Sequence, residues 1–413
     1  MAGLRADIAL LRHRRFALLF AARTISVVGN GLGRVALVFG VLALPHASPV
    51  RLAVVVAAQA LPQLLLVLFG GVLADRLPRH RVLVGAELLA FVAWSGLAAM
   101  FLTGWAPTPA LAGAAALAGA ATAVFLPAFT GVVPEVVPAA SLQAGNGLLG
   151  LGNNVGQILG LSLAGGAVVV LGPGWTCGVN AVSFLISAGC IAALKLPARG
   201  IGAVTTTLAD LRAGWSEFRS RQWLWVIAVQ YAFVVAALNA NLGVLGPLIA
   251  QRDLGGAPAW SAIVLAQAVG TIVGVVIAIR LRPRHPLRVA VLVTLASALP
   301  LLTLAAGAPL PVTMAAMFAR GICADIFGVL WTTTLQREIP SQAISRVSSW
   351  DLFGALAFAP LGLLLAGPVA VAVGPHAALY GCAALVVVAT LAALLSPEVR
   401  RLRATSTAAR SGR

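Results

Sequence analysis

Apolar runs of about 20 residues recur along the whole chain, separated by short segments rich in arginine, proline and glycine. A helix of roughly that length spans the hydrocarbon core of a bilayer. Hydrophobic residues make up 60% of the chain and charged residues 9%, whereas soluble domains carry about 25% charged residues. The sequence therefore predicts an all-α polytopic membrane protein. It excludes a conventional soluble enzyme, a secreted disulfide scaffold and a disordered chain.

Breaks at charged residues, prolines and glycines divide the apolar sequence into twelve predicted transmembrane helices. We place them near 16–44, 51–74, 82–103, 109–133, 143–171, 175–195, 223–250, 259–280, 288–306, 311–335, 348–371 and 376–395.

The basic residues predict the orientation of these spans. Of the 28 lysines and arginines, 23 fall on the side that holds both chain ends, and only Arg51 and Arg252 fall on the other. Because positively charged loops stay in the cytoplasm, both ends are expected there. The net charge of +17 then comes from basic loops that set the orientation of the spans. These loops lie next to the lipid headgroups, which are expected partners. The charge therefore does not indicate nucleic-acid binding.

One long polar connector, 196–222, divides the spans into two sets of six. Its alternation of Leu208, Leu211, Trp215 and Phe218 with charged residues predicts an amphipathic helix on the cytoplasmic face. We therefore expect an N-terminal six-helix bundle at 1–195, the connector at 196–222, and a C-terminal six-helix bundle with a basic tail at 223–413.

The two predicted bundles share landmarks. Pro78-Arg79-His80 recurs as Pro283-Arg284-His285 at an offset of 205, and Pro134 recurs as Pro340 at an offset of 206. Nearly equal offsets and equal span counts indicate an internal repeat. Transporters are often built from such repeats, with the substrate site where they meet.

The segment after the second predicted span reads Gly71-Val-Leu-Ala-Asp75-Arg76-Leu-Pro-Arg79-His80-Arg81. It resembles the loop motif G-x-L-A-D-R-x-x-R-[KR] of the major facilitator superfamily, in the place where that family carries it. The resemblance implies the twelve-helix major facilitator fold. Further segments look like the branch of enterobactin exporters and macrolide-efflux proteins: 16–34, Leu61-Pro62, 133–138 and 146–149.

The resemblance also implies a cytoplasmic gate. Asp75 would accept hydrogen bonds from the start of span eleven, the positive end of that helix, and Asp351 would belong to the same latch. Gly71 is assigned to the gate with them. The arginines of the motif would add charge pairs between the halves, or they serve topology alone: Arg76, Arg79 and Arg81.

Two positions depart from the pattern of proton-coupled relatives. Span five has a stripe of small residues at Gly152, Gly156 and Gly160, but Leu161 stands where antiporters of the family have proline. Span one has Asn30 where relatives often have an acid. The glycine stripe fits either close helix packing or a role in coupling.

Ionisable residues within spans are candidates for function because burying charge in a bilayer is costly. Asp325 is our first candidate for proton coupling, and a permanent ion pair with an arginine is the alternative. Arg34 and Arg320 are further candidates, and an Arg34–Asp325 contact is one hypothesis. Glu87 and Arg23 are candidates for coupling too; they lie at similar depth, and the alternative is that they simply neutralise each other.

Polar groups inside the apolar spans are candidates for lining a substrate cavity, although each could instead bond across helices. They are Asn30, Gln59, Gln63, Asn153, Gln157, Tyr231, Asn239 and Gln267. Few fixed charges among scattered amides suit a bulky, mostly apolar substrate.

The chain has no G-x-x-x-x-G-K-[ST] motif for ATP, no HExxH motif and no nucleophile elbow. We therefore predict no enzyme, cofactor or metal. The first prediction is a monomeric secondary exporter of small amphipathic molecules, driven by proton antiport, in a bacterial plasma membrane. The alternatives are an importer or facilitator of a metabolite, siderophore or lipid, and a non-transporting sensor or assembly protein.

Overall fold

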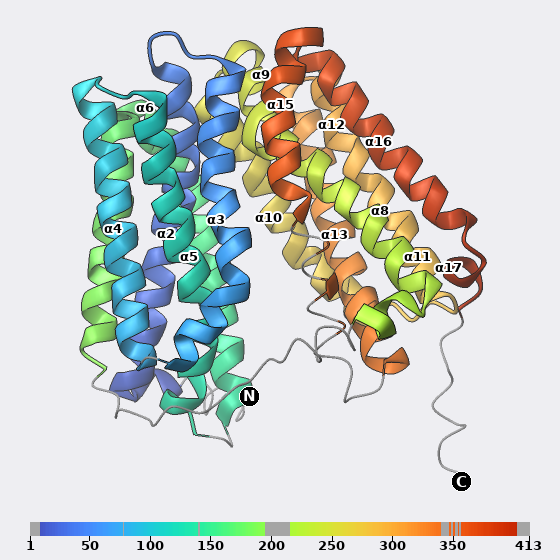
Figure 1. Cartoon of the computed structure of the whole chain (residues 1–413), viewed down its shortest axis with the longest axis horizontal. Helices are drawn as coiled ribbons and strands as arrows, with labels where there is room; N and C mark the ends of the chain where they lie inside the picture. The colour runs from blue at the N-terminus through green and yellow to red at the C-terminus, as the bar shows by residue number, and fades with distance from the viewer. Residues whose placement is uncertain are drawn as a thin grey trace. The chain divides into compact units, whose positions relative to one another are not determined.

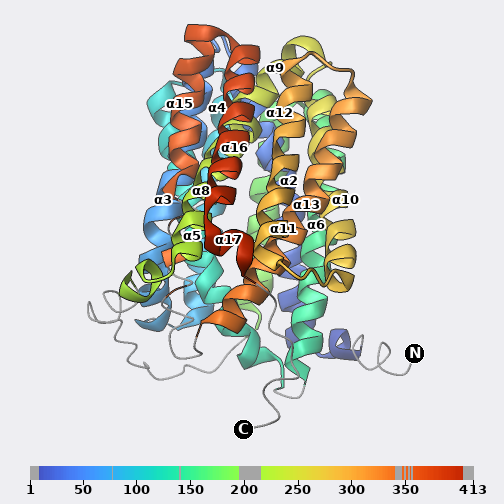
Figure 2. The same ribbon diagram turned by 90° about the vertical axis from the view of Figure 1, so that its right-hand side faces the viewer.

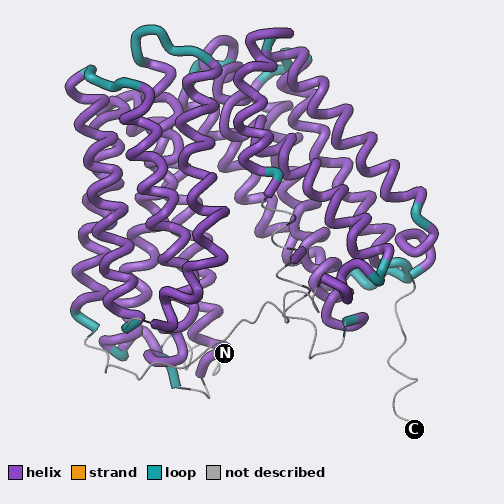
Figure 3. The backbone as a smooth tube through the Cα atoms, viewed as in Figure 1, coloured by secondary structure: helices purple, strands orange, loops and turns teal. Residues whose placement is uncertain are grey.

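The structure is a computed structural model of the whole chain. It describes residues 9–76, 78–138, 141–194, 215–339, 347, 350–351, 354 and 357–402. Within those ranges the side chains of residues 63, 67–76, 79, 127, 130, 131, 143 and 279 are not described. The described residues form helices and loops, with no strand among them (Figure 3).

The N-terminal helices follow the predicted spans closely (Figure 1). The N-terminal helices are α2 (Arg14–Ala43), α3 (Pro49–Arg76), α4 (Arg79–Thr103), α5 (Thr108–Val136) and α6 (Leu142–Ala192). A short 3-10 helix, η1 (Ala9–Arg12), precedes α2. The 51 residues of α6 contain two predicted spans. They are divided at Gly172, whose φ of 80° and ψ of 163° break the helix just before Pro173.

The C-terminal helices are shorter and more often interrupted (Figure 2). Span seven consists of α8 (Gln222–Ala240), the π-helical turn η3 (Asn241–Leu245) and α9 (Gly246–Asp253), and α10 (Ala257–Arg280) follows. Span nine consists of α11 (Pro286–Val293), the 3-10 turn η4 (Thr294–Ser297) and α12 (Ala298–Ala305). The remaining helices are α13 (Leu310–Glu338), α15 (Ala359–Val373), α16 (Pro375–Leu395) and α17 (Pro397–Arg401).

Ten helices in the described part of the chain are long and apolar enough to cross a membrane. One of them contains both spans of α6, and the shorter apolar helix α15 corresponds to predicted span eleven. Each of the twelve predicted spans thus overlaps a described helix, and the all-α fold class is confirmed.

The chain forms two compact units. The first contains residues 1–205 and 246–265, and the second contains 206–245 and 266–413. The end of span seven and the start of span eight thus belong with the N-terminal helices. Within the first unit, Gly165 of α6 meets Pro258 of α10 so closely that a side chain at Gly165 would clash with its backbone.

Close packing in the first unit depends on glycine. α2 packs along α6, and α3 packs along α5. A Cβ added at Gly160 of α6 would lie 2.4 Å from the carbonyl oxygen of Val28, and one at Gly119 of α5 would lie 1.9 Å from that of Gln59. The glycines at 152, 156 and 160 all face α2, so the stripe identified in span five is a helix-packing face.

The second unit has a hydrogen-bonded polar cluster in its interior. Gln230 Nε2 donates to Thr294 Oγ1 at 2.9 Å and to Thr390 Oγ1 at 3.2 Å. All three side chains are buried and come from α8, η4 and α16. The cluster therefore ties three spans together where lipid or apolar side chains could not satisfy these groups.

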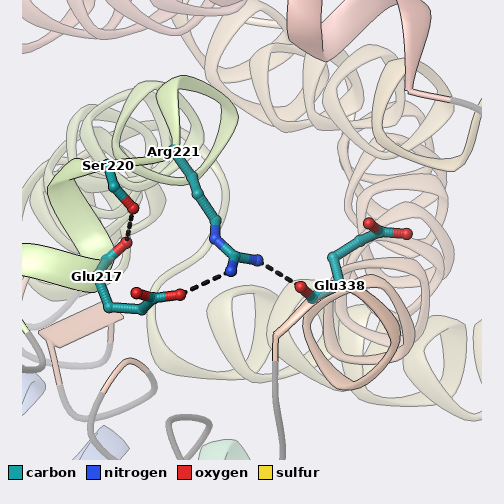
Figure 4. A network of polar contacts seen from close by, with 4 residues as sticks. All are labelled: Glu217, Ser220, Arg221 and Glu338. Carbon is teal, nitrogen blue, oxygen red and sulfur yellow. Dashed lines mark hydrogen bonds and ion pairs between the residues drawn. The ribbon is translucent and has the colours of Figure 1, made fainter.

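The connector is described only from residue 215. Residues 215–219 are helical, and Trp215 stacks on Phe218 with ring centroids 5.8 Å apart. Arg221 then donates to Glu217 at 2.6 Å and to the backbone carbonyl of Glu338 at the end of α13 (Figure 4). Leu208 and Leu211 of the predicted amphipathic helix lie outside the described residues.

Candidate functional site

Arg23 of α2 lies in a polar and aromatic environment within the first unit. Its Nη2 donates to Asn153 Oδ1 of α6 at 2.9 Å. Its guanidinium lies over the rings of Phe125 and Phe129, 5.6 and 5.4 Å from their centroids. Cation–π contacts and one amide therefore hold this charge within the span.

Glu87 of α4 is 2% exposed, and its Oε1 accepts a hydrogen bond from Ser187 Oγ of α6 at 2.8 Å. Its Oε2 is buried without a partner. The pair expected to neutralise each other, Glu87 and Arg23, interact electrostatically but form no ion pair within 4.0 Å in the described structure. Each instead has a neutral hydrogen-bond partner, since α6 presents Ser187 and Asn153 at the two positions.

Arg34 and Asn30 lie further along α2. The Arg34 side chain is exposed and, within the described part of the chain, makes no hydrogen bond or ion pair. Asn30 is half-buried between two glycines that pack on α6. The proposed Arg34–Asp325 contact joins residues of different units and stays a prediction.

Arg320 and Asp325 of α13 both lie in the second unit but do not pair with each other. Arg320 is 8% exposed, and its Nε and Nη1 are buried without hydrogen-bond partners. Asp325 is half-buried, packs on Gly274 of α10 and lies beside Thr271, whose hydroxyl donates to the Gln267 carbonyl at 3.1 Å. Asp325 and Arg320 therefore form no ion pair with each other in this structure.

Aromatic rings connect this region with Asp351. Tyr231 of α8 stacks on Phe327 of α13 at 4.4 Å, and Phe327 is nearly parallel to Trp331 at 6.2 Å. Trp331 Nε1 donates to Asp351 Oδ2 at 2.9 Å. Asp351 thus has a hydrogen-bond donor within its own unit.

The gate motif lies at the end of α3 and the start of α4. Gly71, Asp75 and Arg76 are in the last turns of α3, but their side chains, and those of Gln63 and Arg79, lie outside the described ones. Arg81 is exposed in the first turn of α4. The latch between Asp75 and Asp351 therefore stays a prediction.

The predicted cavity amides have differing partners. Asn153 is bonded to Arg23, while Asn239 Nδ2 donates to the Val235 carbonyl of its own helix at 2.9 Å. Gln267 of α10 has a buried Oε1 with no partner. Gln59 and Gln157 are half-buried. Among the described residues, no group of three or more His, Cys, Asp or Glu side chains could hold a metal ion.

Asn241 is a further polar group within span seven, two residues after Asn239. It is fully buried in η3, and both side-chain polar atoms lack partners. Pro247 has no N–H for the carbonyl of Gly243, so the backbone there departs from the α-helix and a π-turn results. Pro247 was the sequence signal that could have located this turn.

Comparison with known proteins agrees with this architecture. Residues 17–355 match the family model of the Major Facilitator Superfamily. The multidrug efflux pump Tap of Mycolicibacterium fortuitum is 27% identical, with 93% of this chain and 96% of the relative covered. The Tap pump of Mycobacterium tuberculosis (strain ATCC 25618 / H37Rv) is 28% identical, with 95% of each covered.

Solved structures of transporters share the fold. The nucleoside transporter NupG superposes with a TM-score of 0.72 at 14% identity, covering 92% of this chain and 98% of that one. A POT family transporter in complex with 5-aminolevulinic acid has a TM-score of 0.74 at 10% identity, covering 93% and 96%. The family model matches most of the chain, and this match shows that the chain belongs to the major facilitator superfamily.

Proposed function

We propose that this chain is a secondary active exporter of small amphipathic molecules such as drugs or natural products, driven by proton antiport. The observation that carries the proposal is the similarity to multidrug efflux pumps over nearly the whole length of both chains. A multi-pass helical fold without an ATP-binding motif is consistent with a gradient as energy source. A bacterial plasma membrane is the location that fits these relatives.

The polar groups within the spans support an amphipathic substrate. Half-buried amides at Asn30, Gln59 and Gln157 offer donors and acceptors among apolar side chains. Such groups can orient a molecule without requiring one fixed charge pattern, which suits a carrier of several related compounds.

Asp325 remains our candidate for exchanging protons. A coupling carboxyl must be reachable by water or substrate in some state, and Asp325 is half-buried whereas Glu87 is 2% exposed and capped by Ser187. A carboxylate inside a span that lies beside neutral groups can bind and release a proton more readily than one in a strong ion pair.

The first test measures retention of a panel of lipophilic dyes and antibiotics in cells that lack their own efflux pumps. Cells expressing the intact protein are compared with cells expressing Asp325→Asn, Asp75→Asn and Glu217→Gln. Glu217 is the matched acid-to-amide control because its partially exposed carboxylate pairs with Arg221 outside the spans. In everted vesicles with an imposed pH gradient, the pH difference across the membrane is then followed to see whether addition of the drug dissipates it.

We expect the intact protein and Glu217→Gln to lower retention, and Asp325→Asn and Asp75→Asn to abolish this effect. Substrate-dependent loss of the pH gradient should occur with the intact protein and not with Asp325→Asn. Accumulation in place of export would favour the importer, and binding without flux would favour the sensor. Export that continues without a proton gradient would refute proton antiport as the energy source and would leave the proposed export function in place.

A further inference from the structure

Within the part of the chain that the structure describes, Arg320 is an enclosed cation without a counter-ion. Its side chain is 8% exposed, and two of its three guanidinium nitrogens, Nε and Nη1, are buried with no hydrogen-bond partner. Within the described residues no carboxylate lies within ion-pair distance of it. An unpaired buried charge is costly, so a site that keeps one is poised for a ligand that neutralises it.

Asp325 and Asp351 are two carboxylates of the same unit, and each lies beside a neutral side chain. Asp325 lies beside Thr271, and Trp331 Nε1 donates to Asp351 Oδ2 at 2.9 Å. Neither acid is bonded to Arg320. The guanidinium therefore keeps its planar set of N–H donors, which match a carboxylate or another oxyanion in a two-pronged geometry.

Tyr231 supplies an aromatic surface next to this cation. It lies within electrostatic range of Arg320, and its ring stacks on Phe327 with an interplanar angle of 11°. The stacking fixes the ring against α13 and leaves Tyr231 half-buried. A cation beside a fixed aromatic ring suits a ligand that combines an acidic group with a flat apolar body.

An acceptor lies on the helix that faces this part of α13. Gly321 follows Arg320 and packs directly on the backbone carbonyl of Gln267, whose side-chain Oε1 is buried and unpartnered. Donors and an acceptor thus occur at neighbouring levels of α10 and α13.

We propose that Arg320 and Tyr231 form a binding site for the acidic group of a transported molecule, so that this carrier prefers amphipathic molecules with a carboxylate or another oxyanion. The inference rests on the proposed export function and narrows its substrate class. Arg320 determines specificity by contacting the substrate.

The test uses rhodamine 110 and rhodamine 123, which share one chromophore and differ in that the carboxyl group of the first is a methyl ester in the second. Fluorescence anisotropy measures binding of each dye to the purified full chain in neutral lipid–detergent micelles. The variants are Arg320→Gln, Arg320→Lys and Tyr231→Phe. Arg282→Gln is the matched control, since Arg282 is exposed in a loop.

We expect the intact protein and Arg282→Gln to bind the acid about ten-fold or more tightly than the ester, the range for a buried charge-assisted hydrogen bond. Arg320→Gln should bring this ratio to about one while ester binding is retained, which also shows that the variant is folded. Arg320→Lys should keep part of the preference. Tyr231→Phe should keep the stacking and most of the ratio.

An unchanged ratio in Arg320→Gln, an equal loss of both dyes, or no binding of the acid by the intact protein would overturn this assignment. Displacement of the dye by added phosphatidylglycerol would assign the site to a lipid headgroup and would overturn it too. The proposed export function fails separately, if the intact protein lowers retention of no compound in the cellular panel.

Discussion

Gly160 offers a direct way to separate packing from coupling in span five. Replacing it with alanine places a Cβ 2.4 Å from the carbonyl oxygen of Val28 and 3.0 Å from the Cα of Gly31. Both neighbours are backbone atoms of α2, so neither can rotate away. The contact with the oxygen is 0.6 Å (3.0 minus 2.4) inside the distance below which real Cβ atoms essentially never approach.

The expected magnitude follows from two opposing terms. Alanine favours a helix interior over glycine by about 1 kcal/mol. Forcing α2 and α6 apart costs about 1–3 kcal/mol, as overpacking in other interiors does. Gly160→Ala should therefore destabilise the first unit by up to about 2 kcal/mol.

Gly166→Ala is the matched control in the same helix. A Cβ there meets nothing within 4 Å, so only the helix-propensity gain remains. The two variants should differ by about 1–3 kcal/mol, which corresponds to roughly 2–12 °C in Tm for a unit of this size. Thermal unfolding of the purified protein followed by tryptophan fluorescence measures this difference, and the cellular retention assay is run beside it.

Equal Tm values for Gly160→Ala and Gly166→Ala would refute the packing argument. If Gly160→Ala had the same Tm as Gly166→Ala and lost export, the stripe would have a role in coupling instead. A lowered Tm with export retained at low temperature is the outcome that packing alone predicts.

Three further substitutions test contacts inside each unit. Ser187→Ala leaves the buried carboxyl of Glu87 with no hydrogen bond, so a loss of about 1–3 kcal/mol is expected, seen as a lower Tm, and an unchanged Tm would contradict it. Thr390→Val removes one acceptor of Gln230 Nε2 but leaves the other, Thr294, so a smaller loss of about 0.5–1.5 kcal/mol is expected in the same assay. A loss larger than that of Ser187→Ala would contradict the idea that Thr294 still satisfies Gln230. Arg221→Ala breaks a partly exposed pair and should cost about 1 kcal/mol or less, with a smaller difference from the intact protein in high salt; a salt-independent loss would show that packing dominates.

The sequence by itself determined the number and position of the spans. About 20 consecutive apolar residues have few alternatives in a bilayer, because every backbone group must be bonded within the helix. The glycine stripe of span five could also be read directly, since i, i+4 spacing places Gly152, Gly156 and Gly160 on one face. The motif at Gly71–Arg81 identified the family.

Only the tertiary structure decided which groups meet. Arg23 is bonded to Asn153 and Glu87 to Ser187, although equal depth had suggested that the two charges neutralise each other. The physical reason is that spans surrounded by lipid and by other spans are apolar on every side, so periodicity does not reveal which face points inward. The partners of a charge within a span therefore depend on how the helices are rotated and packed. For the same reason, only the structure could show that two guanidinium nitrogens of Arg320 have no hydrogen-bond partner.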